Sequence, residues 1–178
     1  MGNLKDAHYQ VFRDMLLYDM LRGFHSTGVA TMEEGGQVRT IKSVGPATEF
    51  FDHFTPTHFH THPEMGAGIF KKDYKILLGH NRWATVGEVV VENAHPFIMG
   101  NTIGAHNGTL RTYSDLKGHG EHIVDSKCLF DNIDHNGIEH TWENFYGAAA
   151  ITYIDNKTKK LHLVKNGERP LWLLELDG

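Results

Sequence analysis

The sequence lacks the features of secreted, membrane-spanning and nucleic-acid-binding proteins. Its single cysteine, Cys128, excludes an internal disulfide framework and suits a reducing compartment. It has no apolar run long enough to cross a membrane and no apolar or basic leader at its start. The net charge is −5, and Lys and Arg form no basic run. We therefore expect a cytoplasmic protein with no membrane partner and no nucleic-acid partner.

What remains is the composition of an ordinary globular protein. The 178 residues are 40% apolar and 22% charged, which fits one domain over residues 1–178 with a sizeable core. The 19 glycines and 14 histidines stand out. Glycine is common where strands turn sharply or where backbone must approach a neighbour closely.

The hydrophobic pattern predicts an α+β fold rich in sheet. A helix over 6–21 is favoured by apolar residues at helical spacing, with Asp6 as its N-cap and Gly23 as its C′ glycine. Alternating residues predict one hairpin over 29–44 and another over 147–164. We expect further strands over 74–78, 102–105 and 171–176, and helices over 48–54 and 125–133.

Three short motifs follow one another in the middle of the chain and supply complementary chemistry. Arg82 carries a planar fork of donors that can hold a carboxylate in two parallel bonds. The Asn107 side-chain amide and the Gly108 backbone N–H can stabilise an oxyanion. The motifs are Gly79–Thr85, Asn93–Pro96 and Gly104–Gly108.

Each of these residues also has a purely structural interpretation. Arg82 alone is typical of a surface or ion-paired arginine. Asn107-Gly108 is the commonest type I′ hairpin signal, and Asp125 is a good helix N-cap. His95 and His106 are more typical of hydrogen-bonded residues that shape loops than of proton carriers. A helix end and turn would account for Arg22, Ser26 and Gly28.

A metal site and a reactive thiol are weaker hypotheses. His58, His60 and His62 alternate, so a strand would place them on one face as a metal site requires. Prolines bracket this stretch and favour a loop, so we expect no metal and no cofactor. Cys128 lies beside Leu129 and is expected to be a small buried residue.

Read in order, the motifs resemble those of the class II glutamine amidotransferases, which are N-terminal-nucleophile hydrolases. The resemblance covers nearly the whole chain and is strongest to the short phage-encoded members, which places the protein in a bacterial or phage-infected host cytoplasm. It implies an αββα four-layer sandwich, here incomplete at both ends. The flanking motifs that belong to it are Arg22–Gly28, Asp125-Ser126 and Arg169-Pro170-Leu171.

The resemblance also implies an activity and a set of roles. The family hydrolyses the side-chain amide of glutamine to glutamate and ammonia, using an N-terminal cysteine as nucleophile. Arg82 would hold the substrate carboxylate, Asp125 its ammonium, and Asn107 with Gly108 would form the oxyanion hole. Glutamine or glutamate is the expected ligand, and an ammonia-accepting protein or a second copy the expected partner. The remaining substrate-binding residues would be Arg22, Trp83, Thr85, His95 and His106.

The chain departs from the family pattern at its start, where Met1-Gly2 stands in place of Cys-Gly. As written, it is not expected to hydrolyse glutamine by the family mechanism, and Cys128, expected on the helix after Asp125, cannot substitute. A binding or regulatory pseudoenzyme is therefore the alternative. Val86, where the family often has histidine, and Lys127, where it has a polar residue, are smaller departures. A missing strand would leave an open sheet edge and favour dimerisation or low stability.

Overall fold

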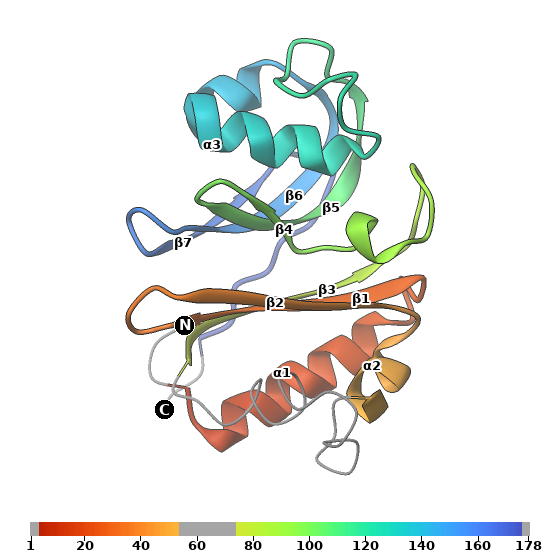
Figure 1. Ribbon diagram of the computed structural model, residues 1–178, viewed down its shortest axis with the longest axis vertical. Helices are drawn as coiled ribbons and strands as arrows, with labels where there is room; N and C mark the ends of the chain where they lie inside the picture. Colours follow the sequence, from red (N-terminus) through yellow and green to blue (C-terminus); the bar gives the residue numbers. More distant parts are fainter. Residues whose placement is uncertain (1–3, 54–73, 176–178) are drawn as a thin grey trace.

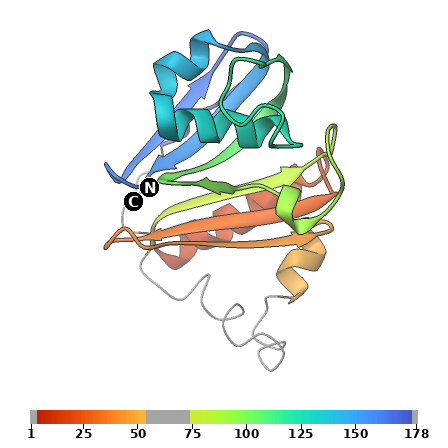
Figure 2. The ribbon, with the colours of Figure 1, turned by 45° about the horizontal axis from the view of Figure 1, so that its top comes forward.

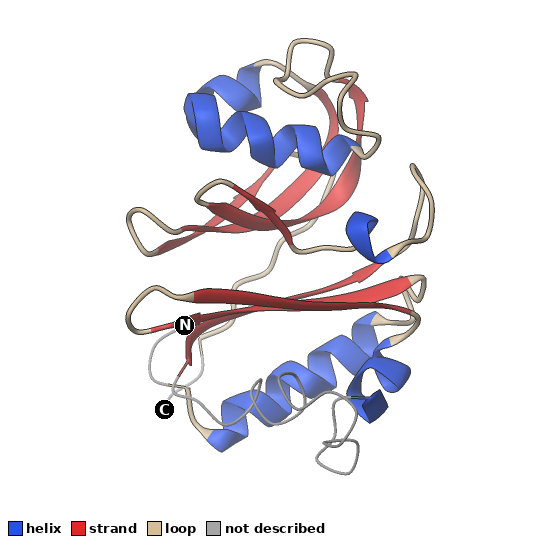
Figure 3. Ribbon diagram, in the orientation of Figure 1, coloured by secondary structure: helices blue, strands red, loops and turns tan. Residues whose placement is uncertain are grey.

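The computed structural model describes residues 4–53 and 74–175, which form four layers in the order α, β, β, α (Figure 1). Colouring by secondary structure separates the two sheets from the helices outside them (Figure 3). No helix within these described residues is long and apolar enough to cross a membrane. The elements are α1 Asp6–Asp19, β1 Ser26–Glu33, β2 Val38–Val44, α2 Ala47–His53, β3 Tyr74–Arg82, η2 Val91–Asn93, β4 Phe97–Met99, β5 Thr102–Thr112, α3 Asp125–Glu143, β6 Tyr146–Asp155 and β7 Lys160–Lys165.

The first sheet has the order β2-β1-β3, and all its pairings are antiparallel. Its central strand, β1, is buried from its first residue to Met32 because both of its faces are covered. Val29 packs toward α1 and α2 with Leu16 and Phe50, whereas Ala30 faces the second sheet.

The second sheet has the order β4-β5-β6-β7, also antiparallel throughout. It lies face to face with the first sheet (Figure 2). Apolar side chains from both sheets form the core between them: Ala30, Met32, Ile76, Leu78, Ile103, Ala105 and Ile154.

Helix α3 covers the outer face of the second sheet. Phe130 lies directly over Gly104 of β5, where an added Cβ would collide with the phenylalanine ring. The helix is kinked at Gly137, whose φ of 84° lies in the left-handed region that favours glycine. The packing of Phe130 on Gly104 and a hydrogen bond from the Leu110 nitrogen to Asp125 hold the start of α3 beside β5.

The structure confirms both hairpins and the four-layer αββα arrangement, with four differences from the expected elements. Helix α1 starts after Lys5, so Asp6 lies inside the first turn and is not the N-cap. Gly23 is not a left-handed cap: it allows close packing, since a Cβ there would lie 2.7 Å from the Trp83 nitrogen. Residues 171–175 form no strand, and Trp172 is 89% exposed. Strand β5 and helix α3 run well past their expected ends.

Candidate active site

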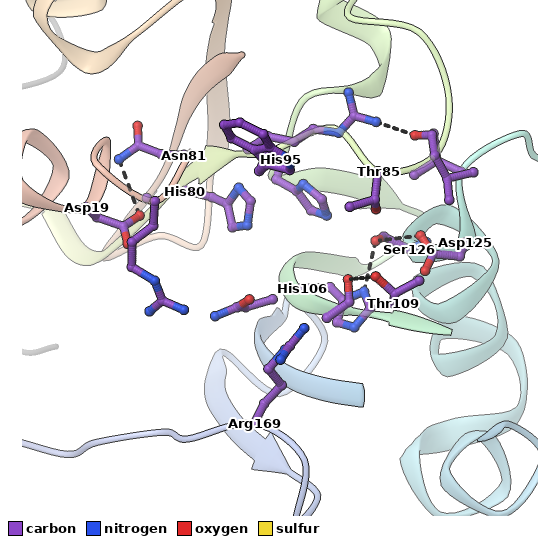
Figure 4. A pocket seen from close by; sticks show the side chains of 18 residues that line it. Asp19, His80, Asn81, Thr85, His95, His106, Thr109, Asp125, Ser126 and Arg169 are labelled. Carbon is purple, nitrogen blue, oxygen red and sulfur yellow. Dashed lines mark hydrogen bonds between the residues drawn. The ribbon is translucent and has the colours of Figure 1, made fainter. Parts of the chain in front are cut away.

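One cavity of about 320 Å³ lies where β3, β5 and the start of α3 meet (Figure 4). Its volume is at the lower end of the range for small-molecule sites. It is lined by all nine residues that the sequence suggested for a glutamine site: Arg22, Arg82, Trp83, Thr85, His95, His106, Asn107, Gly108 and Asp125.

Arg82 is the last residue of β3 and is only 4% exposed, so it is not a surface arginine. Its Nη1 donates to the Glu88 carbonyl oxygen at 3.2 Å and its Nη2 to the Val86 carbonyl oxygen. Burial lowers the pKa of its guanidinium, and the nearby Asp125 opposes that shift. An arginine stays charged in proteins, and two of its five N–H groups are occupied. Arg82 also lines the cavity, so it is a candidate to hold an anionic ligand group there.

Asp125 is the first residue of α3, and the N-cap position belongs to Val124, so the N-cap interpretation was wrong. Its Oδ2 accepts a hydrogen bond from the Leu110 nitrogen at 2.8 Å, and its Oδ1 accepts one from the Ser126 nitrogen at 2.8 Å. Two backbone donors thus fix a buried carboxylate at the wall of the cavity. The Ser126 hydroxyl also lies 3.3 Å from Oδ1, so Oδ2 is the oxygen that retains capacity for a further donor, such as an ammonium group.

Asn107 and Gly108 lie inside β5, paired with Ala150 and Ala149, so they do not form a hairpin turn. Asn107 is exposed and lines the cavity. A Cβ on Gly108 would collide with the Ala148 carbonyl oxygen and approach the His106 ring. Glycine is therefore required at 108 by the packing, and both residues present polar groups to the cavity from a rigid strand.

His106 is buried and is hydrogen-bonded, as expected, but from within a strand rather than a loop. Its Nε2 lies 3.2 Å from the Ala148 carbonyl oxygen and its Nδ1 lies 2.9 Å from Ser126 Oγ. A carbonyl oxygen only accepts, so Nε2 carries a proton. Burial lowers the pKa of His106, with Asp125 acting in the opposite direction.

His80 and His95 form a second histidine pair, with ring centroids 4.2 Å apart. Neither nitrogen of His95 nor Nδ1 of His80 has a hydrogen-bond partner among the described residues, which corrects the expectation of a bonded His95. Burial is the main reason why the pKa of His80 falls to about 4 and that of His95 falls well below its usual value. Both rings are neutral at pH 7 and form a polar but uncharged floor.

Aromatic and exposed residues form the rim. The Trp83 ring is 54% exposed and lies against His25, with ring centroids 4.7 Å apart. Thr85 and Arg22 are also exposed. Ser26 and Gly28 belong to β1 rather than to a turn, and a Cβ on Gly28 would collide with the His95 carbonyl oxygen. This close approach seats the Asn93–Pro96 segment on the first sheet.

Among the lining residues that were not expected at the site, two carry charged side chains, Asp19 and Arg169. Asp19 lies in the last turn of α1 and accepts a hydrogen bond from Asn81 Nδ2 at 3.3 Å. A carboxylate near a helix C-terminus interacts unfavourably with the helix dipole. The position of Asp19 in the predicted helix could therefore have indicated a functional role. Arg169, after β7, appeared only as part of a motif. Lys127 does not line the cavity, because its Nζ donates to Asn93 Oδ1 at 3.3 Å.

The thiol and the histidine stretch lie apart from this chemistry. Cys128 is fully buried, as expected, and burial raises the pKa of its thiol to about 11. His58, His60 and His62 lie outside the described residues. Within residues 4–53 and 74–175, no group of three or more His, Cys, Asp or Glu side chains is arranged to hold a metal ion.

Sequence comparison finds relatives among the glutamine–fructose-6-phosphate aminotransferases (isomerizing). That of Buchnera aphidicola is 31% identical over 148 residues, which cover 79% of this chain and 21% of the relative. That of Acanthamoeba polyphaga mimivirus is 27% identical over 164 residues, covering 82% of this chain and 25% of the relative. The chain therefore spans about a fifth to a quarter of the length of these relatives. No family model matches the chain.

Solved structures share the fold. The glutamine phosphoribosylpyrophosphate amidotransferase of B. subtilis superposes with a TM-score of 0.58 at 20% identity, covering 87% of this chain and 34% of that one. An allosteric regulatory enzyme of purine biosynthesis gives a TM-score of 0.56 at 23% identity, covering 80% and 32%. By homology to the aminotransferases and by its N-terminal-nucleophile hydrolase fold, the chain belongs to the class II glutamine amidotransferases.

Proposed function

We propose that this domain binds L-glutamine in the cavity and hydrolyses its side-chain amide to glutamate and ammonia when the chain carries an N-terminal cysteine. The observation that carries the proposal is the convergence of Arg82, Asp125, Asn107 and Gly108 on one small cavity. These groups come from three separate elements, and together they complement each charged or polar group of a glutamine zwitterion.

Each polar group of glutamine has a complementary residue among those that line the cavity. Arg82 would hold the α-carboxylate, and Asp125 would accept hydrogen bonds from the α-ammonium. These two contacts would direct the side-chain amide to Asn107 and Gly108. Positioning of this kind contributes several kcal/mol to a rate, and one oxyanion donor contributes about two to three powers of ten.

The reaction needs a nucleophile that these residues do not supply. A cysteine thiolate would attack the amide carbon, and the free α-amine would pass the thiol proton to the departing nitrogen. The C–N bond breaks, ammonia leaves, and a glutamyl thioester remains. Water then attacks the thioester, releasing glutamate and restoring the thiol.

The length of α1 indicates how such a cysteine would reach the cavity. Asp6 and Asp19 are the two ends of this 14-residue helix, and Asp19 lines the cavity. At 1.5 Å per residue the helix is about 20 Å long. An extended segment rises about 3.3 Å per residue, so about six extended residues, added before Met1, would match the length of α1.

This geometry sets the test. Two versions of the chain would carry an added extended segment of about six residues, one beginning with Cys and the other with Ser. We expect glutamine-dependent release of glutamate and ammonia from the Cys version, and none from the Ser version or from the chain as given. Asp125→Asn in the Cys version should raise KM strongly, whereas Arg39→Gln, at an exposed arginine of β2, should not. A folded Cys version that binds glutamine without releasing ammonia would contradict the proposal.

A second candidate function is a binding module without turnover, with a partner protein as its target. It is favoured by the fact that Arg82 and Asp125, the groups suited to the ends of an amino acid, already line one cavity within the described residues. Calorimetry with L-glutamine and the chain as given would test it, with Asp125→Asn as the control. Absence of any binding would remove this candidate. An ammonia-accepting partner and a homodimer stay predictions.

A further inference from the structure

Arg169 enters the cavity from the segment that follows β7 and is not one of the residues proposed to bind glutamine. Figure 4 shows its side chain extending toward the same space as His106 and Thr109. Asp125 and Arg82, the groups suited to the α-carbon end of an amino acid, come from α3 and β3. His106 and Thr109 flank Asn107 and Gly108 on β5, so Arg169 lies beside the segment where the side-chain amide of glutamine would sit.

The turn that presents Arg169 is rigidly held. The Asn166 side chain donates to the Gly147 carbonyl oxygen at 2.6 Å and accepts from the Glu168 nitrogen at 3.1 Å. Glu168 then receives two hydrogen bonds from Arg111, at 2.6 and 2.7 Å. These bonds fix the main chain immediately before Arg169, so the direction of its side chain is not left to a flexible tail.

The charge of Arg169 is not compensated within the described residues. It makes no ion pair or side-chain hydrogen bond there, and its Nε is buried without an acceptor. The two carboxylates of the cavity are already hydrogen-bonded, Asp19 to Asn81 and Asp125 to backbone nitrogens. Its charge also contributes, after burial, to the lowered pKa of His106. A partly desolvated cation without a partner is costly, and an anionic ligand group would remove that cost.

We infer that Arg169 makes the Asn107–Gly108 end of the cavity an anion subsite that holds the γ-carboxylate of L-glutamate. A guanidinium binds a carboxylate through two parallel hydrogen bonds but can only donate to a neutral amide. The chain as given therefore binds glutamate more tightly than glutamine. This inference rests on the proposed function, because it assumes that Arg82 and Asp125 hold the α-amino acid end.

The test is calorimetric titration of the chain as given with L-glutamate and with L-glutamine. We expect a preference for glutamate of about tenfold, the size of one charge-assisted contact. Arg169→Gln should abolish the preference, and Arg169→Lys, which retains the charge but not the fork, should retain part of it. Arg39→Gln, which removes a positive charge outside the cavity, should leave it unchanged. Equal affinities in the unmodified chain, or loss of the preference in Arg22→Gln instead of Arg169→Gln, would overturn the inference.

Glutarate separates this inference from the proposed function, because it has two carboxylates and no ammonium. Asp125→Asn should weaken both amino acids and leave glutarate unaffected. If neither amino acid binds but glutarate binds and is weakened by Arg169→Gln, the proposed function fails and the anion subsite stands. If glutarate binding is absent or insensitive to Arg169→Gln in a variant with unchanged thermal unfolding, the subsite is wrong.

Discussion

The neutral histidines of the cavity floor should make the folded state sensitive to acid. Burial lowers the pKa of His80 to about 4, whereas an unfolded histidine has a pKa of about 6.5. Between these values the unfolded chain binds a proton that the folded chain does not, so the free energy of unfolding falls as pH decreases from about 6.5 toward 4. From pH 6.5 to pH 5, 1.5 units at 1.36 kcal/mol each amount to about 2 kcal/mol for His80.

His95 acts in the same direction, because its pKa is also lowered by burial and by the adjacent His80. His95 therefore adds to the loss of stability in acid. The loss of about 2 kcal/mol from His80 is already a substantial fraction of the 5–15 kcal/mol by which folded domains are typically stable. Of the other charged groups facing the pair, Arg82 acts in the same sense, whereas Asp125 favours the charged form of His106.

Urea unfolding followed by circular dichroism at pH 8 and at pH 5 would measure this loss. His80→Asn should reduce the difference between the two pH values by about 2 kcal/mol, because one of the titrating groups is gone. His119→Asn, at an exposed histidine, should leave the difference unchanged. Equal free energies of unfolding at both pH values, or an equal loss in His80→Asn, would refute the reasoning.

Three further predictions concern packing and burial. Gly108→Ala should lower the free energy of unfolding by more than about 2 kcal/mol, since the added Cβ has no room. Gly35→Ala, where the added Cβ meets open space, should change the free energy of unfolding by no more than about 0.5 kcal/mol. Equal urea midpoints for the two variants would contradict this. Cys128 should resist a thiol reagent such as DTNB until the protein unfolds, because its thiol is fully buried with a raised pKa; rapid reaction in native buffer would show otherwise. Asn132→Leu should lower the free energy of unfolding in urea by about 2–3 kcal/mol. The fully buried Asn132 amide donates a hydrogen bond to Thr141 and accepts one from the Lys117 nitrogen, and both bonds would be lost. An unchanged free energy of unfolding would contradict this.

The sequence predicted the parts of the fold that repeat locally. Helix α1 and both hairpins follow from residue spacing and from turns rich in glycine or polar residues, which act over a few positions. Strand β4 and η2 span three residues each, too few for any period to show. Asn107-Gly108 reads as a turn, yet pairing with β6 holds it in a strand, so tertiary contacts overrode a local preference.

In the candidate site too, local motifs predicted some residues, whereas features that depend on tertiary contacts were not predicted. Arg82, Asp125 and Asn107 were expected because their residue types occur in dense motifs. The cavity-facing direction of Arg169 was not expected, because it depends on the Asn166 and Glu168 bonds after β7, which no local pattern reports. The pair of neutral histidines in the cavity could not be predicted from the sequence either, because His80 and His95 come into contact only in the folded protein.

The two bonds from Arg82 to Val86 and Glu88 have an evolutionary consequence. Both acceptors are main-chain oxygens, which every amino acid provides. The side chains at 86 and 88 can therefore change by mutation while the guanidinium stays anchored to the same two carbonyl oxygens.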